Sequence, residues 1–209
     1  WDSNTASIIH KPEHAFLENT LPSMRAAFDL GADMVEFDVR LTSDQQLAVF
    51  HDFLLDYRTD GKGLVASFTM AELRELDLGY GYTADGGKTY PFRGKGTGLM
   101  VSAEEVFAAF PDKSFLIHAK DGGETVGRLL TALFKGKSSE WLGKIGVYGD
   151  HDTMMVLKSE FPQLKVLSMQ TLKRALISYI LLGWTGYIPD SMKNAQIHIP
   201  LKYARYLWG

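Results

Sequence analysis

Two short segments of the chain carry side chains suited to acid/base and metal chemistry. In residues 35–39, Glu36 and Asp38 alternate with apolar residues, so a strand would place both carboxylates on one face. Two carboxylates on one face repel each other, so they need a cation between them or a protonated partner to be stable there. His51 ends an apolar run thirteen residues after Asp38, and its imidazole can transfer a proton near neutral pH. The spacing indicates a metal-assisted acid/base site.

Each of these residues also has a simpler interpretation. The alternation around Glu36 and Asp38 fits an exposed antiparallel strand whose charged face is solvated and binds nothing. A single histidine such as His51 is most often only a polar residue at the end of a strand. Other motifs in the chain decide between these interpretations, because a pocket forms where side chains from several strands or loops meet.

Apolar runs that resemble strands alternate with helical patterns along the chain, and this alternation predicts an α/β fold with a parallel sheet. A helix is expected to begin at Asn19 or Thr20 and to end before Gly31. The glycine-rich stretch 80–98 is expected to be a surface loop or small insertion that faces substrate. Strands are expected at 8–10, 34–41, 47–51, 114–120, 145–148, 165–169 and 196–199, and further helices at 103–110, 125–134, 152–161 and 172–182.

The apolar stretch 172–187 is interpreted first as a packed helix, and without covering strands it would leave an exposed patch. The aromatic residues Tyr203, Tyr206 and Trp208 near the end carry the same two interpretations, core packing or an aromatic belt at a bilayer surface.

Composition and charge exclude several classes of protein. The 209 residues are 45% hydrophobic, which favours one domain over residues 1–209. A net charge of −3 gives no field that would attract nucleic acid, and the lack of cysteine excludes disulfides and thiol catalysis. The chain begins at Trp1, so a leader or membrane anchor is expected to lie outside this sequence. A cytoplasmic and an exported or anchored location both stay open, as does the oligomeric state.

An ordered series of motifs resembles the glycerophosphodiester phosphodiesterase family. The resemblance implies a TIM (β/α)8-type barrel with its working residues at the carboxyl ends of the strands. Fewer than eight strands are expected here, so the barrel would be incomplete at the C-terminal end. The motifs are His10-Lys11, Glu18-Asn19-Thr20-Leu21, the stretch from Gly31 to Val39, Thr42-Ser43-Asp44, His51-Asp52, the stretch from Arg58 to Gly63, Glu72-Leu73 and the stretch from Phe115 to Lys120.

The resemblance also implies a role for each matching residue. Glu36 and Asp38 stand at two metal-ligand positions, and His118 stands where the family has a third carboxylate. His10 and His51 stand at the two positions of the acid/base histidines. Lys11 and Lys120 match residues that bind the substrate phosphate. Glu18 is either a charge that favours the start of a helix or a group that supports the pocket from outside.

Three departures from the family pattern affect the expected chemistry. Lys11 replaces an arginine and loses its planar fork, and Pro12 replaces a glycine. The resemblance implies one divalent cation, Mg²⁺ or Ca²⁺, whereas an imidazole ligand from His118 favours Mn²⁺, Co²⁺ or Zn²⁺.

The expected activity is hydrolysis of a small glycerophosphodiester to glycerol 3-phosphate and an alcohol. The alternatives are a phospholipase D-like lipid phosphodiesterase and a catalytically impaired relative that binds phosphodiester or lipid. No sequence feature supports contact with a membrane beyond the aromatic and apolar residues near the end.

Overall fold

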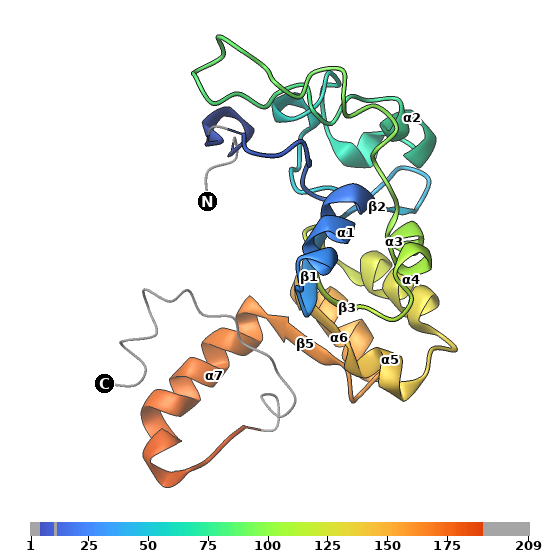
Figure 1. Cartoon of the computed structure of the whole chain (residues 1–209). Helices are drawn as coiled ribbons and strands as arrows, with labels where there is room; N and C mark the ends of the chain where they lie inside the picture. Colours follow the sequence, from blue (N-terminus) through green and yellow to red (C-terminus); the bar gives the residue numbers. More distant parts are fainter. Residues whose placement is uncertain (1–4, 11, 190–209) are drawn as a thin grey trace.

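The protein is built around a five-stranded sheet with helices packed on one face (Figure 1). The computed structural model describes residues 5–10 and 12–189, with only the backbone for Ile8, Ile180 and Gly183. The strands are β1 (Met34–Leu41), β2 (Leu47–Val49), β3 (Ser114–Ala119), β4 (Ile145–Gly149) and β5 (Lys165–Ser168). The helices are α1 (Leu21–Asp29), α2 (Met70–Arg74), α3 (Ala103–Ala109), α4 (Glu124–Phe134), α5 (Ser139–Gly143), α6 (His151–Glu160) and α7 (Met169–Leu182), and the 3-10 helices are η1 (Thr5–Ile8), η2 (Leu55–Tyr57), η3 (Val65–Ser67) and η4 (Gly183–Thr185).

The strand order is β2-β1-β3-β4-β5, and the last four strands of this order are parallel. Only β2 is antiparallel, because it returns beside β1 as a hairpin in which Val39 pairs with Val49. The prediction of a parallel sheet is therefore correct for β1, β3, β4 and β5 and wrong for β2. A loop of five residues between β1 and β2 is too short for the crossover that a parallel pair needs.

The alternation predicted for β1 is present and divides the sheet into two faces. Phe37 and Val39 point into the main hydrophobic core, whereas Glu36 and Asp38 lie on the opposite face. Helices α3 to α6 cover the core face, as Figure 1 shows. The core face therefore holds the fold together, and the other face is free to carry polar groups.

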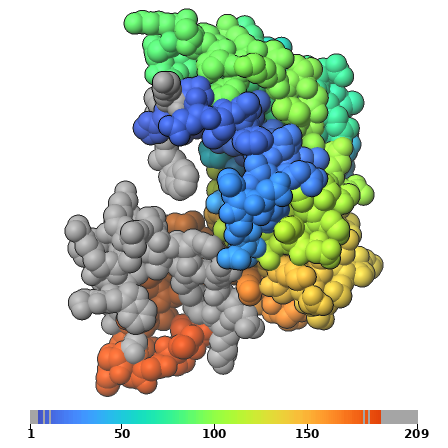
Figure 2. All heavy atoms as spheres, in the orientation of Figure 1, coloured from blue at the N-terminus to red at the C-terminus, as the bar shows by residue number. Residues whose placement is uncertain are grey.

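A second hydrophobic cluster lies under the long connections between β2 and α3. It includes Phe50, Leu55, Tyr82 and Phe92, so the 80–98 loop is anchored by its own buried aromatic side chains. Figure 2 shows this loop in green beside η1 in blue, and the backbone N–H of Thr83 donates to Ala6 at 3.0 Å. The predicted loop is confirmed as a segment without regular helix or strand.

The ends of α1 and α6 follow from local hydrogen bonding. Thr20 caps α1 in a reciprocal arrangement with Ser23, so Thr20 is the N-cap and Asn19 is left for another contact. Asp150 caps α6 by accepting from the N–H groups of Asp152 and Thr153. Both helices begin within two residues of the predicted position.

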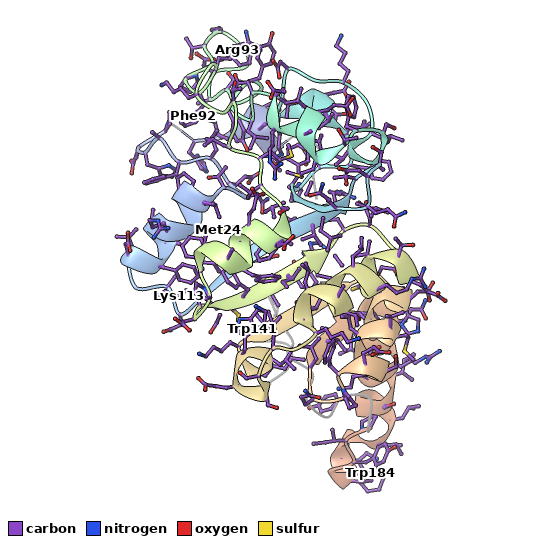
Figure 3. The ribbon with its side chains drawn as sticks, turned by 90° about the vertical axis from the view of Figure 1, so that its right-hand side faces the viewer. Met24, Phe92, Arg93, Lys113, Trp141 and Trp184 are labelled. Carbon is purple, nitrogen blue, oxygen red and sulfur yellow. The ribbon has the colours of Figure 1, made fainter. Side chains whose placement is uncertain are left out.

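Two further sequence predictions are wrong, and those made for the end of the chain lie outside the described residues. The segment 8–10 is no strand, because Thr5–Ile8 forms a 3-10 helix instead. The helix α7 is not packed as expected, since Ala175 is its one core residue among the described side chains and Trp184 beyond its end is 86% exposed (Figure 3). The predicted strand 196–199 and the aromatic residues 203, 206 and 208 fall outside the described residues.

The fold class is confirmed as α/β, of the type found in TIM barrels. Over residues 5–10 and 12–189 the sheet is open, with β2 and β5 at its edges.

Candidate active site

The face of the sheet opposite the helices presents a row of polar side chains from three neighbouring strands. The register pairs Asp38 of β1 with His118 of β3, and His118 with Tyr148 of β4. Residues paired in register on one face lie side by side, and Glu36 precedes Asp38 on that same face. Parallel pairing of β1, β3 and β4 thus assembles the site.

Three members of this group could together hold a metal ion. One ligand atom each from Glu36, Asp38 and His118 can be chosen so that all lie within 4.8 Å of one another. Two carboxylate oxygens and an imidazole nitrogen are donors that Mn²⁺, Co²⁺ and Zn²⁺ accept readily. The chemistry of the donor set fits a divalent cation, and the structure brings together the three residues that the sequence singled out for this role.

Asp38 is the most heavily contacted carboxylate of the group. Asn19 Nδ2 donates to Asp38 Oδ2 at 3.0 Å, while His118 Nδ1 and Lys120 Nζ lie 3.1 and 3.4 Å from Asp38 Oδ1. Burial alone would raise the pKa of Asp38, but the hydrogen bonds from His118 and Asn19 and the charge of Lys120 outweigh it and lower the pKa. Asp38 is therefore ionised at neutral pH.

The imidazole of His51 lies between the carboxylate of Asp52 and the ammonium group of Lys120. His51 Nδ1 lies 2.6 Å from Asp52 Oδ1, and His51 Nε2 lies 3.1 Å from Lys120 Nζ. Because a lysine ammonium only donates, Nε2 accepts and the proton of the neutral ring is on Nδ1, where Asp52 accepts it. These contacts direct the basic nitrogen of His51 toward Lys120 and Asp38.

A buried ion-pair network supports Asp52 from behind. Arg58 Nε donates to Asp52 Oδ2 at 2.7 Å, and Arg58 also pairs with Glu18 and with the Tyr82 hydroxyl at 2.9 Å. Burial alone would raise the pKa of Asp52, but the hydrogen bond to His51 and the charge of Arg58 lower it. Glu18 thus contacts the network that holds His51, which agrees with a supporting position outside the metal group.

Tyr148 packs against two members of the metal group. Its ring stacks on His118 with 4.1 Å between centroids, and its hydroxyl donates to Glu36. Burial and the hydrogen bond to Glu36 both raise the pKa of Tyr148, so the phenol stays a neutral donor. Tyr148 fixes the imidazole plane and one carboxylate together.

Within its described residues, the structure does not connect the candidates at the N-terminal end, His10 and Lys11, with the rest of the site. His10 is exposed after η1, and no hydrogen bond or ion pair joins it to another residue in the described ranges. Pro12 is exposed, and Lys11 lies outside the described residues. The structure therefore brings together Glu36, Asp38, His51, His118 and Lys120, with Glu18 at the edge, and does not join His10 to them by a contact.

Sequence reasoning missed several groups that complete the site. In the sequence, Asp52 stands out only as part of the His51-Asp52 motif and Asn19 as a possible helix cap, yet each contacts a candidate site residue directly. Asn19 has φ of 57°, a conformation that asparagine tolerates better than most residues, and this is a signal for its special position. Tyr148 gave no sequence signal, because its role depends on strand register. Arg58 begins one of the family motifs, but its role depends on a contact with Asp52.

The sequence match to a family model decides the relationship of the chain. The model of the "Glycerophosphoryl diester phosphodiesterase family" matches residues 11–168. The chain belongs to this family. The matched range contains every candidate site residue except His10, which directly precedes it.

Similar proteins agree with this relationship. A glycerophosphodiester phosphodiesterase from Caldanaerobacter subterraneus is 40% identical over 101 residues, and one from Bacillus subtilis is 33% identical over 108 residues. These matches cover 48% and 50% of this chain but only 38% and 36% of the two relatives. The chain therefore matches less than two thirds of the length of either relative.

Solved structures show the same fold at lower identity. The glycerophosphoryl diester phosphodiesterase domain of an uncharacterized Mycobacterium tuberculosis protein has a TM-score of 0.65 at 21% identity, covering 86% of this chain and 62% of that one. An Oleispira antarctica phosphodiesterase in complex with the product sn-glycerol-3-phosphate has a TM-score of 0.60 at 18% identity. The match covers 96% of this chain and 87% of the Oleispira chain. None of the helices in the described part of the chain is long and apolar enough to cross a membrane.

Proposed function

We propose that this protein hydrolyses glycerophosphodiesters to glycerol 3-phosphate and an alcohol, with the help of one divalent metal ion. The observation that carries the proposal is the position of His51. Its Nε2 atom points to Lys120, 3.1 Å away, beside the group formed by Glu36, Asp38 and His118. The Oleispira relative binds sn-glycerol-3-phosphate, which supports the same product here.

Glu36, Asp38 and His118 would hold the cation in this proposal. When bound, a divalent cation neutralises charge on a phosphodiester and orients it for displacement. The Asn19 contact keeps the Asp38 carboxylate in place, and stacking by Tyr148 keeps the His118 ring in place. Because His118 replaces a carboxylate, the group carries one negative charge fewer, which favours Mn²⁺, Co²⁺ or Zn²⁺ over Ca²⁺.

Lys120 and His51 would act on the substrate itself. The Lys120 ammonium lies between Asp38 and His51, where it can bind a non-bridging oxygen of the phosphate. His51 Nε2 has a free lone pair once Lys120 turns to the phosphate, and it can then accept a proton from the attacking group. Asp52 stabilises the imidazolium that results, and Arg58 keeps Asp52 ionised.

His10 would protonate the leaving alkoxide, and Lys11 would contribute a second positive charge to the phosphate. His10 is exposed at the end of the N-terminal segment. An alkoxide is a poor leaving group unless it is protonated, so the reaction needs an acid on the side opposite His51. This pair of roles rests on the family resemblance of the motif at residues 10–11.

The chemistry of the loop at 80–98 favours small polar diesters. Two of its large aromatic side chains, Tyr82 and Phe92, are buried, whereas Tyr80 is partly exposed and Arg93 lies at the outer surface (Figure 3). A lipid diesterase is the second candidate, and the exposed apolar residues of α7 favour it, among them Ile177 and Leu181. An apolar lid over the site would be expected for lipid, and the polar loop argues against it.

The test is release of glycerol 3-phosphate from glycerophosphocholine by the purified chain with Mn²⁺, Co²⁺, Zn²⁺, Mg²⁺ or Ca²⁺ added. We expect turnover that His51→Gln lowers by about 100-fold or more, since a general base contributes that much. His14→Gln is the matched control, because His14 is exposed and its contacts within the described residues are with Phe16.

Choline released from lysophosphatidylcholine but not from glycerophosphocholine would replace the proposal by the lipid diesterase. No turnover with any cation, together with intact folding, would replace it by a binding protein without catalysis. Full turnover in His51→Gln would contradict the role given to His51.

A further inference from the structure

Arg40 is a third charged residue on the face of β1 that carries Glu36 and Asp38, and the proposed function does not use it. Strand alternation places the three on one face at intervals of two residues. Unlike Glu36, which is exposed, the Arg40 side chain is only 9% exposed. A buried arginine beside a reaction centre needs a physical reason, because arginine is rarely buried without partners.

The guanidinium of Arg40 joins two segments that follow different strands. Its Nη1 lies 2.7 Å from Asp121 Oδ1, and its Nη2 donates to the backbone carbonyl of His51 at 2.9 Å. Asp121 also accepts from the backbone N–H of Leu41 through Oδ2 at 2.6 Å. Asp121 directly follows Lys120, so the pair ties the backbones that carry His51 and Lys120 to the end of β1.

A contribution to stability does not by itself explain the ion pair between Arg40 and Asp121. The Nε of Arg40 is buried and has no hydrogen-bond partner within the described residues, and the ring of Phe53 lies 5.3 Å from the guanidinium carbon. Buried ion pairs often contribute little net stability, because desolvation offsets the attraction between the charges. What the guanidinium supplies and an ammonium does not is a planar fork that binds two partners in fixed directions.

We propose that Arg40 and Asp121 are positioning residues that set the distance between His51 and Lys120. Arg40 fixes the carbonyl of His51, and Asp121 fixes the chain next to Lys120. The two side chains then meet at the 3.1 Å contact between His51 Nε2 and Lys120 Nζ, beside Asp38. The kinetic consequence of this inference rests on the proposed diesterase activity, whereas its structural consequence does not.

The decisive variant is Arg40→Lys. A lysine keeps the charge beside Asp121 but reaches one partner only, so the His51 carbonyl loses its donor. We expect kcat for glycerophosphocholine to fall about 10- to 100-fold, because a small displacement of a catalytic group has effects of this size. KM should stay nearly unchanged, since ground-state binding of the phosphate is retained. The ring of His51 should also give a shifted imidazole signal in nitrogen-15 NMR, identified by its loss in His51→Gln.

The matched control is Arg74→Lys. Arg74 pairs with Glu105 at 2.8 Å in a half-exposed position that the proposed site does not include. This variant should leave kcat, KM and the His51 signal unchanged. Asp121→Asn is the second test of the pair, because asparagine offers one acceptor oxygen where two donors, Arg40 and the Leu41 N–H, are bound. Asp121→Asn should also lower kcat, and it replaces Arg40→Lys as the test if Arg40→Lys does not fold.

An unchanged kcat together with an unchanged His51 signal in the folded variants would overturn the inference. A raised KM at constant kcat would overturn it as well, because it would make the pair part of phosphate binding. If the wild-type chain hydrolyses no diester, the proposed function fails, and the His51 signal in Arg40→Lys still decides whether the pair positions the ring.

Discussion

The polar edge of β1 and β3 and the helix α7 stand at opposite extremes of burial in this molecule. At the edge, Asp38 and Arg40 are buried charges, and each has several partners. In α7 and just beyond it, Ile177 and Trp184 are apolar and mostly exposed. Charged residues are thus inside and apolar ones outside, the reverse of the usual distribution.

The two regions differ because of their neighbours in the fold. Strands β1 and β3 each pair on both sides, so their carboxyl ends are surrounded by other segments that supply partners. Helix α7 follows β5, the edge strand of the described sheet, and within the described residues its main contacts are with β5, α6 and η4. In these two regions, burial therefore follows the number of neighbouring strands more closely than the polarity of the segment.

The largest effect in this comparison should come from the core beneath the polar edge. Phe115 is fully buried in β3, and its ring packs against Phe28, Phe37, Phe107 and Phe110. Phe115→Ala should lower the free energy of unfolding by about 3–5 kcal/mol, because it removes a large side chain and leaves a cavity. Urea denaturation measures this, and a loss below about 1 kcal/mol would show that the core repacks and that the edge does not depend on it.

A smaller but more specific effect should follow from Asp52→Asn. An asparagine amide can donate to His51 Nδ1, which would place the ring proton on Nε2 and remove the lone pair that the proposed reaction needs. We expect kcat for glycerophosphocholine to fall about 100-fold, equivalent to about 2.7 kcal/mol. Asp112→Asn, at an exposed position, is the control. Equal turnover in both variants would show that Asp52 has no influence on His51.

The N-cap of α6, Asp150, should make the stability of the protein depend on pH. Asp150 accepts from the N–H groups of Gly123, Asp152 and Thr153, and these hydrogen bonds, led by that from Gly123, lower its pKa from 3.8. Because the pKa of Asp150 is lower in the folded than in the unfolded protein, its ionised carboxylate stabilises the fold at pH values above the unfolded-state pKa. This stabilisation is lost as the pH falls through the folded-state pKa. Asp150→Ala should cost about 1 kcal/mol at pH 7 and progressively less below pH 3.8. A difference in the free energy of unfolding that is independent of pH would contradict the assignment.

The smallest effect should come from α7. Ile177 is 58% exposed, so Ile177→Ser removes little buried surface and should change the free energy of unfolding by less than about 0.5 kcal/mol. Ala175→Ser, at a buried position of the same helix, is the comparison that should cost more. If Ile177→Ser destabilises the chain as strongly as a core substitution, α7 is covered in solution and the comparison between the two regions fails.

Sequence reasoning was most successful where local pattern decides structure. The alternation of Val35, Glu36, Phe37, Asp38 and Val39 gave both the strand and its two faces, because side-chain direction in a strand has a period of two. The starts of α1, α3 and α6 were predicted to within two residues, since capping is also local. The family motif order predicted a shared role for Glu36, Asp38 and His118, and the structure places one ligand atom of each within 4.8 Å of the others.

Features that depend on contacts between elements, whether near or far in the chain, were not predicted. The direction of β2 is decided by the short hairpin loop, and the strand expected at 8–10 has no neighbouring strand to pair with in the described residues. The exposure of α7 depends on what lies beside it, which its apolar sequence does not state. The role of Asp52 depends on Arg58, which locks its carboxylate toward His51 from six residues away.

The central claim is that Glu36, Asp38 and His118 hold the cation on which turnover depends. The direct measurement is Mn²⁺ binding to the metal-stripped chain by electron paramagnetic resonance, with glycerol 3-phosphate release followed in the same titration for the wild type and Asp38→Asn. The account predicts that turnover returns in proportion to bound Mn²⁺ in the wild type, and that Asp38→Asn loses both together. Turnover that survives metal removal, or that returns equally in Asp38→Asn, would contradict it.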